Sequence, residues 1–543
     1  MSMKQQNFSQ LLAELSNIGI ALSVERDHDR LLEMILTRAR EMTGADGGTL
    51  YSRSEDETLR FEIMLTASLG IFRGGTSGEA IDLPPLVLYD ADGQPNRNAV
   101  AAWAALSGET VNIDDAYTNE QFDFSGTREF DRLTGYRSQS FLTVPMTNHE
   151  NEVIGVLQLI NAIDDDTGKI RSFSALEQQL VEALASQAAV SITNRSLIEA
   201  QRQLFDSLIQ LIASAIDEKS PYTAGHCRRV PELANMLADA ACRTRSGPLA
   251  DFSMTDQEKY ELEVAAWLHD CGKITTPEFV IDKATKLETI FDRIELVNTR
   301  FAVLERDAEI NALRRQLSAA GLEAPDLPTD PGYRDELNAL RRERDFICRS
   351  NYGTESMSES DKAHIECIAG RAWRNVDGEQ APLLNDDEVQ NLQIGRGTLT
   401  VREREIINNH VAVTIKMLES LPYPKHLRRV PEYAGGHHEK MDGSGYPNGL
   451  TREQMSVPAR MLAIADVFEA LTASDRPYKK AMPLSQALQI LGQMKLDRHI
   501  DPDLFDAFMW NGVYMQYADA HLAPEQIDDV DLAAIPGYVP PGP

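Results

Sequence analysis

Residues 174–216 contain neither glycine nor proline. Apolar side chains recur along this stretch at intervals of three and four residues, which predicts one continuous helix several times longer than the globular average of about 11 residues. The apolar positions are Leu180, Val181, Leu184, Ala188, Val190, Ile192, Leu197, Leu204, Leu208, Leu211, Ile212 and Ile216. We therefore expect a linker helix over residues 174–216, with a folded domain on each side of it.

A long amphipathic helix commonly pairs with its own copy in a parallel dimer, where a twist at one end reaches the other. We accordingly expect a homodimer and regard residues 174–216 as its dimerisation helix. The alternative is a helix that only covers the sheet of the first domain. That alternative explains the first half of the apolar pattern but not the second.

Composition bounds the class of protein. A chain of 543 residues has room for two or three domains, and 25% charged with 42% hydrophobic residues is typical of a globular protein. The net charge of -31 argues against binding to a nucleic acid polymer or a membrane surface, because both are anionic. An anionic small substrate would then be held by metal ions and a few local cations.

The cysteines and the apolar runs indicate where the protein works. The five cysteines are odd in number, show no CxxC spacing, and are absent before Cys227. This usage fits a reducing compartment better than a disulfide framework. Because no apolar run approaches a membrane span and the N-terminus is not a signal peptide, we expect a cytoplasmic protein.

The first domain is expected over residues 1–198. Helical periodicity over residues 9–43 is followed by short alternating segments, of which residues 141–146 and 153–161 should form an antiparallel hairpin. This order of helices, strands and a closing helix indicates an α+β module and resembles a GAF domain. Cyclic-nucleotide-binding GAF members carry Asn-Lys and then Phe-x-x-x-Asp-Glu, whereas here Ala162 follows Asn161 and Glu177-Gln178 follow Phe173. The ligand of this sensor domain is therefore left unknown.

Two stretches after the long helix combine imidazoles with carboxylates. Residues 437–447 read HHEKMDGSGYP, and residues 268–274 read LHDCGKI. Such residues are costly to bury unless they are paired or bound to metal. A carboxylate that follows an imidazole can bridge two divalent ions about 3.5–4 Å apart, the usual arrangement for attack on phosphorus. The two stretches suggest metal-assisted hydrolysis of a phosphoester.

Together these stretches resemble the HD-GYP subgroup of the HD phosphohydrolases over roughly residues 205–515. The resemblance implies an all-α HD-superfamily domain that hydrolyses cyclic di-GMP to pGpG and further to GMP in some members. Its motifs here are Tyr222-Thr223-Ala224-Gly225-His226, His269-Asp270-x-x-Lys273, His410, His437-His438-Glu439-x-x-Asp442-Gly443-x-Gly445-Tyr446-Pro447, Ala459-Arg460, Ala465-Asp466 and Asp475-Arg476-Pro477-Tyr478.

The resemblance implies a site with two divalent metal ions. Imidazole and carboxylate ligands together suit iron or manganese best, with nickel and magnesium as alternatives, and Asp270 is placed to bridge the ions. An acid four residues before the first histidine would recruit a third metal, but that position is Tyr222, which favours two. The implied ligands are His226, His269, Asp270, His410, His437, His438 and Asp466, and the implied catalytic residues are His269, Asp270 and Lys273.

Further residues are expected to hold the substrate. Lys273 would contact a phosphate oxygen, and Tyr446 would stack on a base or brace its loop. Glu439 and Asp442 are expected to orient the metal ligands from behind rather than to bind metal themselves. The remaining expected substrate contacts are Gly443, Gly445, Arg476 and Lys479.

Two other functions remain open. The same chemistry would serve another cyclic dinucleotide, such as cyclic GMP-AMP. A non-catalytic receptor or scaffold would instead bind cyclic di-GMP, or a diguanylate cyclase partner, through its Gly-Tyr-Pro loop. A complete set of ligands argues against the receptor, because a receptor does not need the bridging Asp270.

Two segments depart from the usual pattern of the family. Residues 287–398 replace a short connection and are expected to form an antiparallel helical hairpin, which acts as a lid, a dimer arm, a partner surface or an inert insertion. A seven-residue repeat supports the first helix of this hairpin, through Leu287, Ile290, Ile294, Val297, Phe301, Leu304 and Ala308. The acidic and proline-rich residues 523–543 are expected to form a loose tail.

Overall fold

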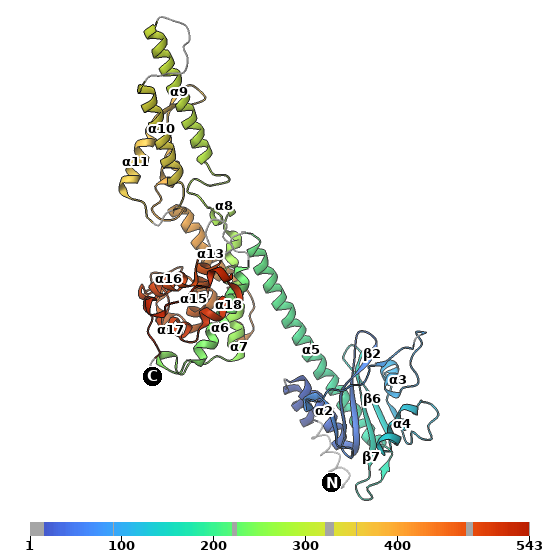
Figure 1. Ribbon diagram of the computed structural model, residues 1–543. Coiled ribbons are helices and arrows are strands. Elements are labelled where there is room, and N and C mark those ends of the chain that lie inside the picture. Colours follow the sequence, from blue (N-terminus) through green and yellow to red (C-terminus); the bar gives the residue numbers. More distant parts are fainter. Residues whose placement is uncertain are drawn as a thin grey trace. The chain divides into compact units, whose positions relative to one another are not determined.

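The computed structural model describes residues 16–25, 27–90, 92–219, 225–320, 331–353, 356–473 and 482–541 (Figure 1). The chain divides into two compact units, Met1–Leu204 and Phe205–Pro543. None of the helices in these described ranges has the length and apolar composition that a membrane-spanning segment requires.

The first unit is built on an antiparallel sheet in the order β3-β2-β1-β7-β6-β5. The predicted hairpin is present, since β6 pairs with β7 and Phe141 lies opposite Ile160. Two short strands extend the sheet, β4 beside β2 and β8 beside β7. The strands are β1 Ala45–Arg53, β2 Thr58–Thr66, β3 Ile71–Gly74, β4 Leu86–Val87, β5 Val111–Ile113, β6 Phe141–Thr147, β7 Val153–Ile163 and β8 Ile170–Arg171.

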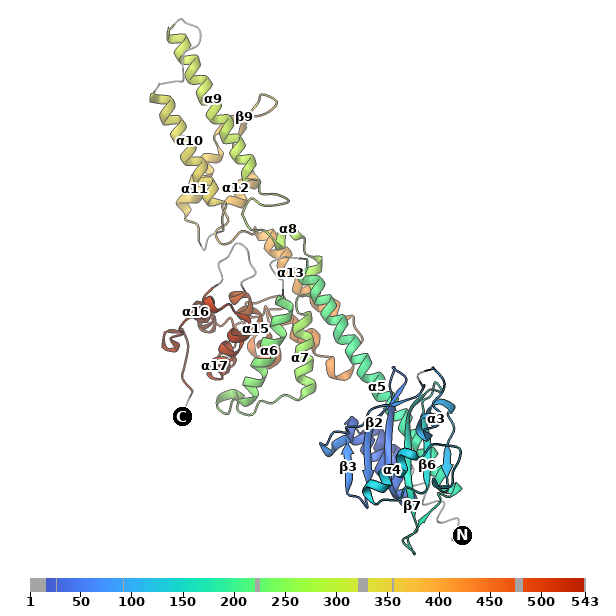
Figure 2. The ribbon, with the colours of Figure 1, turned by 45° about the vertical axis from the view of Figure 1, so that its right-hand side comes forward.

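Helices cover both faces of this sheet (Figure 2). On one face, α2 (His28–Thr43) and the first half of α5 (Ala175–Asp217) pack against strand residues such as Leu157. On the other face, α3 (Val100–Ser107) packs against the neighbouring Val156, and α4 (Ser125–Thr134) lies on the same side (Figure 1). Successive side chains of a strand point to opposite faces, so this alternation allows one strand to serve both layers.

The predicted long helix is α5, and it contributes to two hydrophobic cores. Its early residues, including Leu184 and Ala188, belong to the core of the first unit. Its late residues Ile209, Ala213 and Ile216 belong to the core of the second unit. A helix that only covered the sheet would not account for the second set.

The second unit is a bundle of helices around the buried α15. Eleven residues of α15 are buried, which explains why its sequence is apolar on nearly all sides. Gly492 on α16 lets the backbone at Pro536 approach within a distance that a Cβ atom would block. The helices are α6 His226–Arg243, α7 Asp256–Leu268, α8 Glu278–Ile281, α13 Val401–Glu419, α14 Val430–Gly435, α15 Val457–Thr472, α16 Leu484–Leu496, α17 Pro502–Trp510 and α18 Val513–His521, with the 3-10 turn η3 at Cys271–Thr275.

Residues between α8 and α13 form a module with its own core. The two long helices α9 and α10 run side by side, as the predicted hairpin requires (Figures 1 and 2). The module also contains two shorter helices and a two-stranded sheet, which the hairpin prediction missed. Its elements are α9 Ile294–Ala320, α10 Pro331–Ser350, α11 Glu359–Ala369, β9 Ala372–Arg374, β10 Gln380–Pro382 and α12 Asp386–Leu392.

Except for Ile290, the residues of the predicted seven-residue repeat lie in or against the module core. Val297, Phe301 and Ala308 are buried in the module core. Ile290, assigned to the repeat from the sequence, is 94% exposed, because the helix begins only at Ile294.

A buried lysine joins the module to α13. The ammonium of Lys283 donates to both carboxylate oxygens of Glu403 at 2.8 Å and to the amide oxygen of Asn391 at 2.9 Å. Glu403 also caps the start of α13, and Asn391 lies on α12. The entry and exit of the module are therefore fastened to the helix that carries His410.

The expected loose tail is instead packed on the second unit. Ile535 is 5% exposed, and the ammonium of Lys495 donates to the carbonyl of Gly537 at 2.7 Å. The indole of Trp510 donates to the carbonyl of Val539, also at 2.7 Å. The prediction was wrong because local composition does not reveal that Ile535 and its neighbours find an apolar surface on α16.

Candidate metal centre

The sequence stretches rich in histidine meet at one place in the second unit. His226 is the first residue of α6, His269 follows the last residue of α7, and Asp270 immediately precedes η3. His410 lies on α13, and Asp466 lies on α15. His437 and His438 follow the end of α14. The structure thus brings together all seven residues that the resemblance implies as ligands.

Asp270 lies between two groups of donors. Its Oδ2 atom is 3.4 Å from His226 Nε2 and 3.3 Å from His269 Nε2. Its Oδ1 atom is 3.1 Å from His410 Nε2 and 3.9 Å from His437 Nε2. One carboxylate therefore faces a different set of imidazoles with each oxygen, as a bridging ligand does.

Potential ligand atoms form compact clusters on either side of this carboxylate. His226, His269 and Asp466 form one cluster, and His410, His437 and His438 form another, with atoms within 4.8 Å of each other in each case. A third cluster, His269 with Asp270 and His437, joins them. We call the first cluster the α6 position and the second the α13 position.

Backbone carbonyls fix the orientation of three of the imidazoles. The Nδ1–H groups of His269, His410 and His437 donate to the carbonyls of the residues three positions earlier, Ala266, Ile407 and Ala434, at 2.7, 2.5 and 2.6 Å. A carbonyl can only accept, so Nδ1 carries the proton and Nε2 presents its lone pair to the centre.

His226 is held differently, by residues that the sequence analysis did not single out. Its Nδ1 pairs with the carboxylate of Glu469 on α15. Arg229 donates to the other oxygen of Glu469 at 2.7 Å. The available signal was spacing, because Glu469 lies one helical turn after Asp466 and Arg229 one turn after His226.

The electrostatic environment differs between the two positions. Burial acts to lower the pKa of His269, but Asp270 and Asp466 outweigh it and raise that pKa to about 9. Burial lowers the pKa of His438 to about 4 and that of His437 well below its ordinary value. Burial would raise the pKa of Asp270, but Lys273 and His269 hold it well below its ordinary value. His437 and His438 of the α13 position are therefore neutral imidazoles, the form that binds a metal ion.

Unpaired buried atoms show that a metal ion fits this centre. Within the described ranges, Asp270 Oδ1, His410 Nε2 and His437 Nε2 are buried without a hydrogen-bond partner. Each such atom costs about 1–3 kcal/mol unless something satisfies it. Nδ1 of His410 carries the proton, so its Nε2 atom has a lone pair. That lone pair faces another acceptor, Asp270 Oδ1, at 3.1 Å. That arrangement is favourable only with a shared cation or proton between the two atoms.

Gly272 allows the two halves of the centre to approach. A Cβ atom at this residue would lie 2.0 Å from the carbonyl oxygen of His410 and 2.7 Å from the backbone nitrogen of Thr414. The Gly272 N–H donates to the Thr414 hydroxyl at 2.9 Å. Without a side chain, η3 rests directly on α13, and this contact brings Asp270 to His410.

Glu439 and Asp442 make hydrogen bonds to the loop that follows His438, and their predicted role in orienting the metal ligands stays a prediction. Glu439 is fully buried, and its carboxylate accepts from the backbone N–H groups of Asn448 at 2.7 Å and Leu450 at 2.9 Å. Asp442 likewise accepts from Ser444. Among the hydrogen bonds of the described residues, neither carboxylate reaches a ligand imidazole. Both hold the loop after His438.

That loop places an aromatic ring beside the centre. The Tyr446 ring stacks on His438, with ring centroids 4.8 Å apart and planes inclined by 22°. Gly445 permits the fold, because its Cβ would lie 2.4 Å from the backbone nitrogen of Lys440. Gly443 adopts a φ of +79°, which favours glycine. Both glycines thus have backbone roles, and their contact with substrate stays a prediction.

Lys273 is the described cation nearest to Asp270. Its ammonium is 2.5 Å from Asp270 Oδ2, and its side chain is largely buried. Arg476 and Lys479, the other predicted substrate cations, lie outside the described residues, as does Tyr222.

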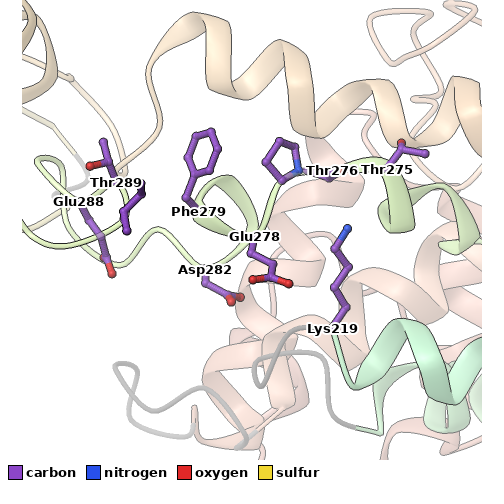
Figure 3. Close-up of a pocket in the computed structure, with 10 residues that line it drawn as sticks. Lys219, Thr275, Thr276, Glu278, Phe279, Asp282, Glu288 and Thr289 are labelled. Atoms are coloured by element: carbon purple, nitrogen blue, oxygen red, sulfur yellow. The ribbon is translucent and has the colours of Figure 1, made fainter.

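A pocket of about 600 Å³ borders the C-terminal end of η3, at Thr275 (Figure 3). Thr275 and Glu278 line one part of it, and Glu288 and Ile290 of the inserted module line another. Lys219 extends toward the Thr275–Thr276 segment, and its ammonium donates to the carbonyls of Lys273 at 3.2 Å and Ile274 at 2.5 Å. Lys219, which follows the end of α5, thereby holds the turn η3 that follows Asp270.

Comparisons with known proteins agree with these two units. A GAF domain model matches residues 27–192, and an HD domain model matches residues 386–504. The 3'3'-cGAMP-specific phosphodiesterase 3 of Vibrio cholerae is 41% identical over 376 residues, 66% of this chain and 54% of that protein. A cyclic di-GMP phosphodiesterase of Pseudomonas aeruginosa is 39% identical over 113 residues, 21% of this chain and 26% of that protein. One of Thermotoga maritima is 34% identical over 113 residues, 21% of this chain and 30% of that protein.

The chain spans about half the length of the first of these relatives and less than a third of the other two. The matched HD segment contains His410, His437, His438 and Asp466, while His226, His269 and Asp270 precede it. The structure joins these earlier residues to the matched segment in one centre. The protein therefore combines an N-terminal GAF domain with an HD domain that carries the motifs of the HD-GYP group.

Proposed function

We propose that the second unit is a metal-dependent phosphodiesterase that hydrolyses cyclic di-GMP to pGpG, and onward to GMP, under control of the GAF domain. The observation that carries this proposal is Asp270, whose two oxygens face separate groups of imidazoles at 3.1–3.4 Å. A receptor would gain nothing from a bridging carboxylate. Hydrolysis of a phosphodiester by two ions uses such a carboxylate to hold the ions close together.

The α6 position would hold one ion and the α13 position the other, with Asp270 shared between them. Two divalent ions bound there would supply a Lewis acid for the phosphate and a water molecule of lowered pKa. A ligand set that mixes imidazoles with carboxylates suits iron, manganese or nickel better than magnesium. This argument favours iron or manganese in the centre.

Residues of the chain would position the substrate against this centre. Lys273 can turn its ammonium from Asp270 to a non-bridging phosphate oxygen, since both are anionic acceptors within reach of one side chain. Tyr446 can stack on a guanine base, and Glu439 holds its loop in place. Arg476 and Lys479 remain proposed phosphate or guanine contacts.

A second candidate substrate is cyclic GMP-AMP. The Vibrio cholerae relative that matches over 66% of this chain is named as specific for 3'3'-cGAMP, whereas the matches to cyclic di-GMP phosphodiesterases are shorter. Both substrates contain a guanine and two phosphodiester bonds, so the same centre would serve either.

Turnover of the two nucleotides by the full chain tests the proposal. Protein purified without oxygen and loaded with Fe²⁺ or Mn²⁺ is expected to convert cyclic di-GMP to the linear dinucleotide, as measured by chromatography. A His269→Ala, Asp270→Ala double variant should give no product. Faster cleavage of cyclic GMP-AMP would select the second substrate. Metal-loaded protein that binds cyclic di-GMP but cleaves neither nucleotide would contradict a phosphodiesterase and favour the receptor.

We also propose that α5 pairs with a second copy of the chain. Leu197, Leu204 and Leu211 lie seven residues apart and are 55%, 62% and 64% exposed. Because a seven-residue repeat of leucines forms the seam of a coiled coil, a parallel partner helix would bury the same residues on both chains.

Aspartate at Leu204 and Leu211 is expected to convert the dimer to a monomer. Each buried leucine contributes about 1.5–3 kcal/mol, so four of them lost from one interface should weaken dimerisation at least about ten-thousandfold. Light scattering coupled to size exclusion measures the mass. The control is Ile290→Asp, the same kind of change at another exposed residue. A double variant that remains dimeric would show that the helices do not pair here.

A further inference from the structure

Of the ligand imidazoles with a described Nδ1 partner, His226 alone pairs with a carboxylate. His269, His410 and His437 each use a backbone carbonyl of the preceding helical turn. His226 is the first residue of α6, so no turn of that helix precedes it to offer a carbonyl. Glu469 takes that place from a different helix.

Glu469 is itself held in a fixed position. Its side chain is 1% exposed, one oxygen pairs with His226, and the other accepts from both Nε and a terminal nitrogen of Arg229 at 2.7 Å. His226 and Arg229 are one turn apart on α6, as Asp466 and Glu469 are on α15. The two helices therefore face each other with one ligand and one supporting residue each.

A carboxylate partner changes a ligand imidazole more than a carbonyl does. It fixes the ring and its tautomer, and its full negative charge makes the opposite nitrogen a stronger donor. The α6 position contains Asp466 and borders Glu469, whereas the α13 position contains three imidazoles. Apart from the shared Asp270, the carboxylates of the centre thus lie at the α6 position.

We propose that Glu469 is a positioning residue that acts through His226 and makes the α6 position the tighter of the two metal sites. This inference rests on the proposed metal centre. It assigns to Glu469 and Arg229 a role in the order of metal loading, with the α6 position filled first and the α13 position filled second.

The test is a titration of the metal-free full chain with Mn²⁺ under anaerobic conditions, with free Mn²⁺ followed by electron paramagnetic resonance. Wild-type protein is expected to bind two ions with unequal affinity. Glu469→Gln keeps the size of the side chain but removes its charge, and it should weaken the tighter ion about 10–100-fold while leaving the other unchanged.

A matched control is Glu388→Gln in the inserted module. Glu388 is also 1% exposed on its side chain and is held by an arginine, Arg300, at 2.7 and 2.8 Å. Both substitutions break a buried ion pair, so both should lower the unfolding temperature. Only Glu469→Gln should change Mn²⁺ binding. Equal binding constants for Glu469→Gln and wild type would overturn the proposal.

A second pair of variants tests the order of loading without changing Glu469. His226→Ala should remove the tighter ion, and His438→Ala should remove the weaker one. If His226→Ala removed the weaker ion and His438→Ala the tighter one, the inference would be overturned even if Glu469→Gln did not fold. Wild-type protein that binds fewer than two ions would instead refute the proposed two-metal function, which separates the two failures.

Discussion

Replacing Asp270 by asparagine is expected to reduce hydrolysis of the cyclic dinucleotide by at least about a thousandfold, the equivalent of about 4 kcal/mol in the barrier. Each carboxylate oxygen faces its own group of imidazoles, at 3.1 Å on one side and 3.3–3.4 Å on the other. An amide is neutral, and its nitrogen cannot act as a ligand. The substituted side chain could therefore serve one metal position at most, so metal content should fall from two ions to one or fewer.

A comparable ion pair elsewhere in the unit provides the control for this substitution. Asp506 pairs with Lys495 at 2.6 Å, much as Asp270 pairs with Lys273 at 2.5 Å. Asp506→Asn should lower the unfolding temperature slightly and leave both ions bound. Elemental analysis and the rate of product formation are measured for both variants. An Asp270→Asn protein that keeps two ions and more than a tenth of the rate would show that the carboxylate does not bridge.

The sequence predicted which ligands would meet because each carries a motif of its own. His269 and Asp270 precede Gly272 at a helix end, and the pair His437-His438 opens a glycine-rich loop. Those local patterns survive in the fold as a helix that ends at Leu268 and a loop held by Glu439. The ligand roles of these residues remain predictions, although their atoms lie within reach of common ions.

Supporting residues were harder to find for a physical reason. Glu469 lies on a helix whose residues are mostly buried, where a single acid gives no periodic signal. Its partner Arg229 is 240 residues away, and only the packing of α15 on α6 makes their contact visible. The hydrogen-bond partners of Glu439 could not be predicted for a related reason, because they lie in a loop whose path the sequence does not specify.

The fold shows the same division between local and long-range information. Helical periodicity predicted α5 and the two long helices of the inserted module, since each depends on residues three and four positions apart. The packed tail depends on Ile535 reaching a surface next to Gly492, and the anchoring of the module depends on Lys283 meeting Glu403. Such contacts join residues far apart in the chain, and composition carries little information about them.

Gly272→Ala is expected to separate the two metal positions. The new methyl group would lie 2.0 Å from the carbonyl oxygen of His410, closer than any Cβ contact allows. Overpacking against movable side chains costs about 1–3 kcal/mol, and here the obstacle is the backbone of α13, so the loss of stability should reach or exceed the upper figure. Relief requires η3 to move away from α13, which would take Asp270 away from His410. The variant should therefore bind one ion in place of two, in addition to unfolding at a lower temperature.

Truncation of neighbouring side chains cannot restore this approach, because the nearest atoms are the carbonyl oxygen of His410 and the backbone nitrogen of Thr414. Gly395→Ala is the matched control, since a Cβ there meets no atom within 4 Å and the residue has no positive φ. It should keep both ions and the unfolding temperature of the wild type. If Gly272→Ala behaved like Gly395→Ala in both measurements, the direct contact of η3 with α13 would not be what holds Asp270 against His410. If the Gly272 variant lost one ion and the Gly395 variant lost none, the absence of a side chain at residue 272 would be as necessary to the two-metal centre as the carboxylate of Asp270.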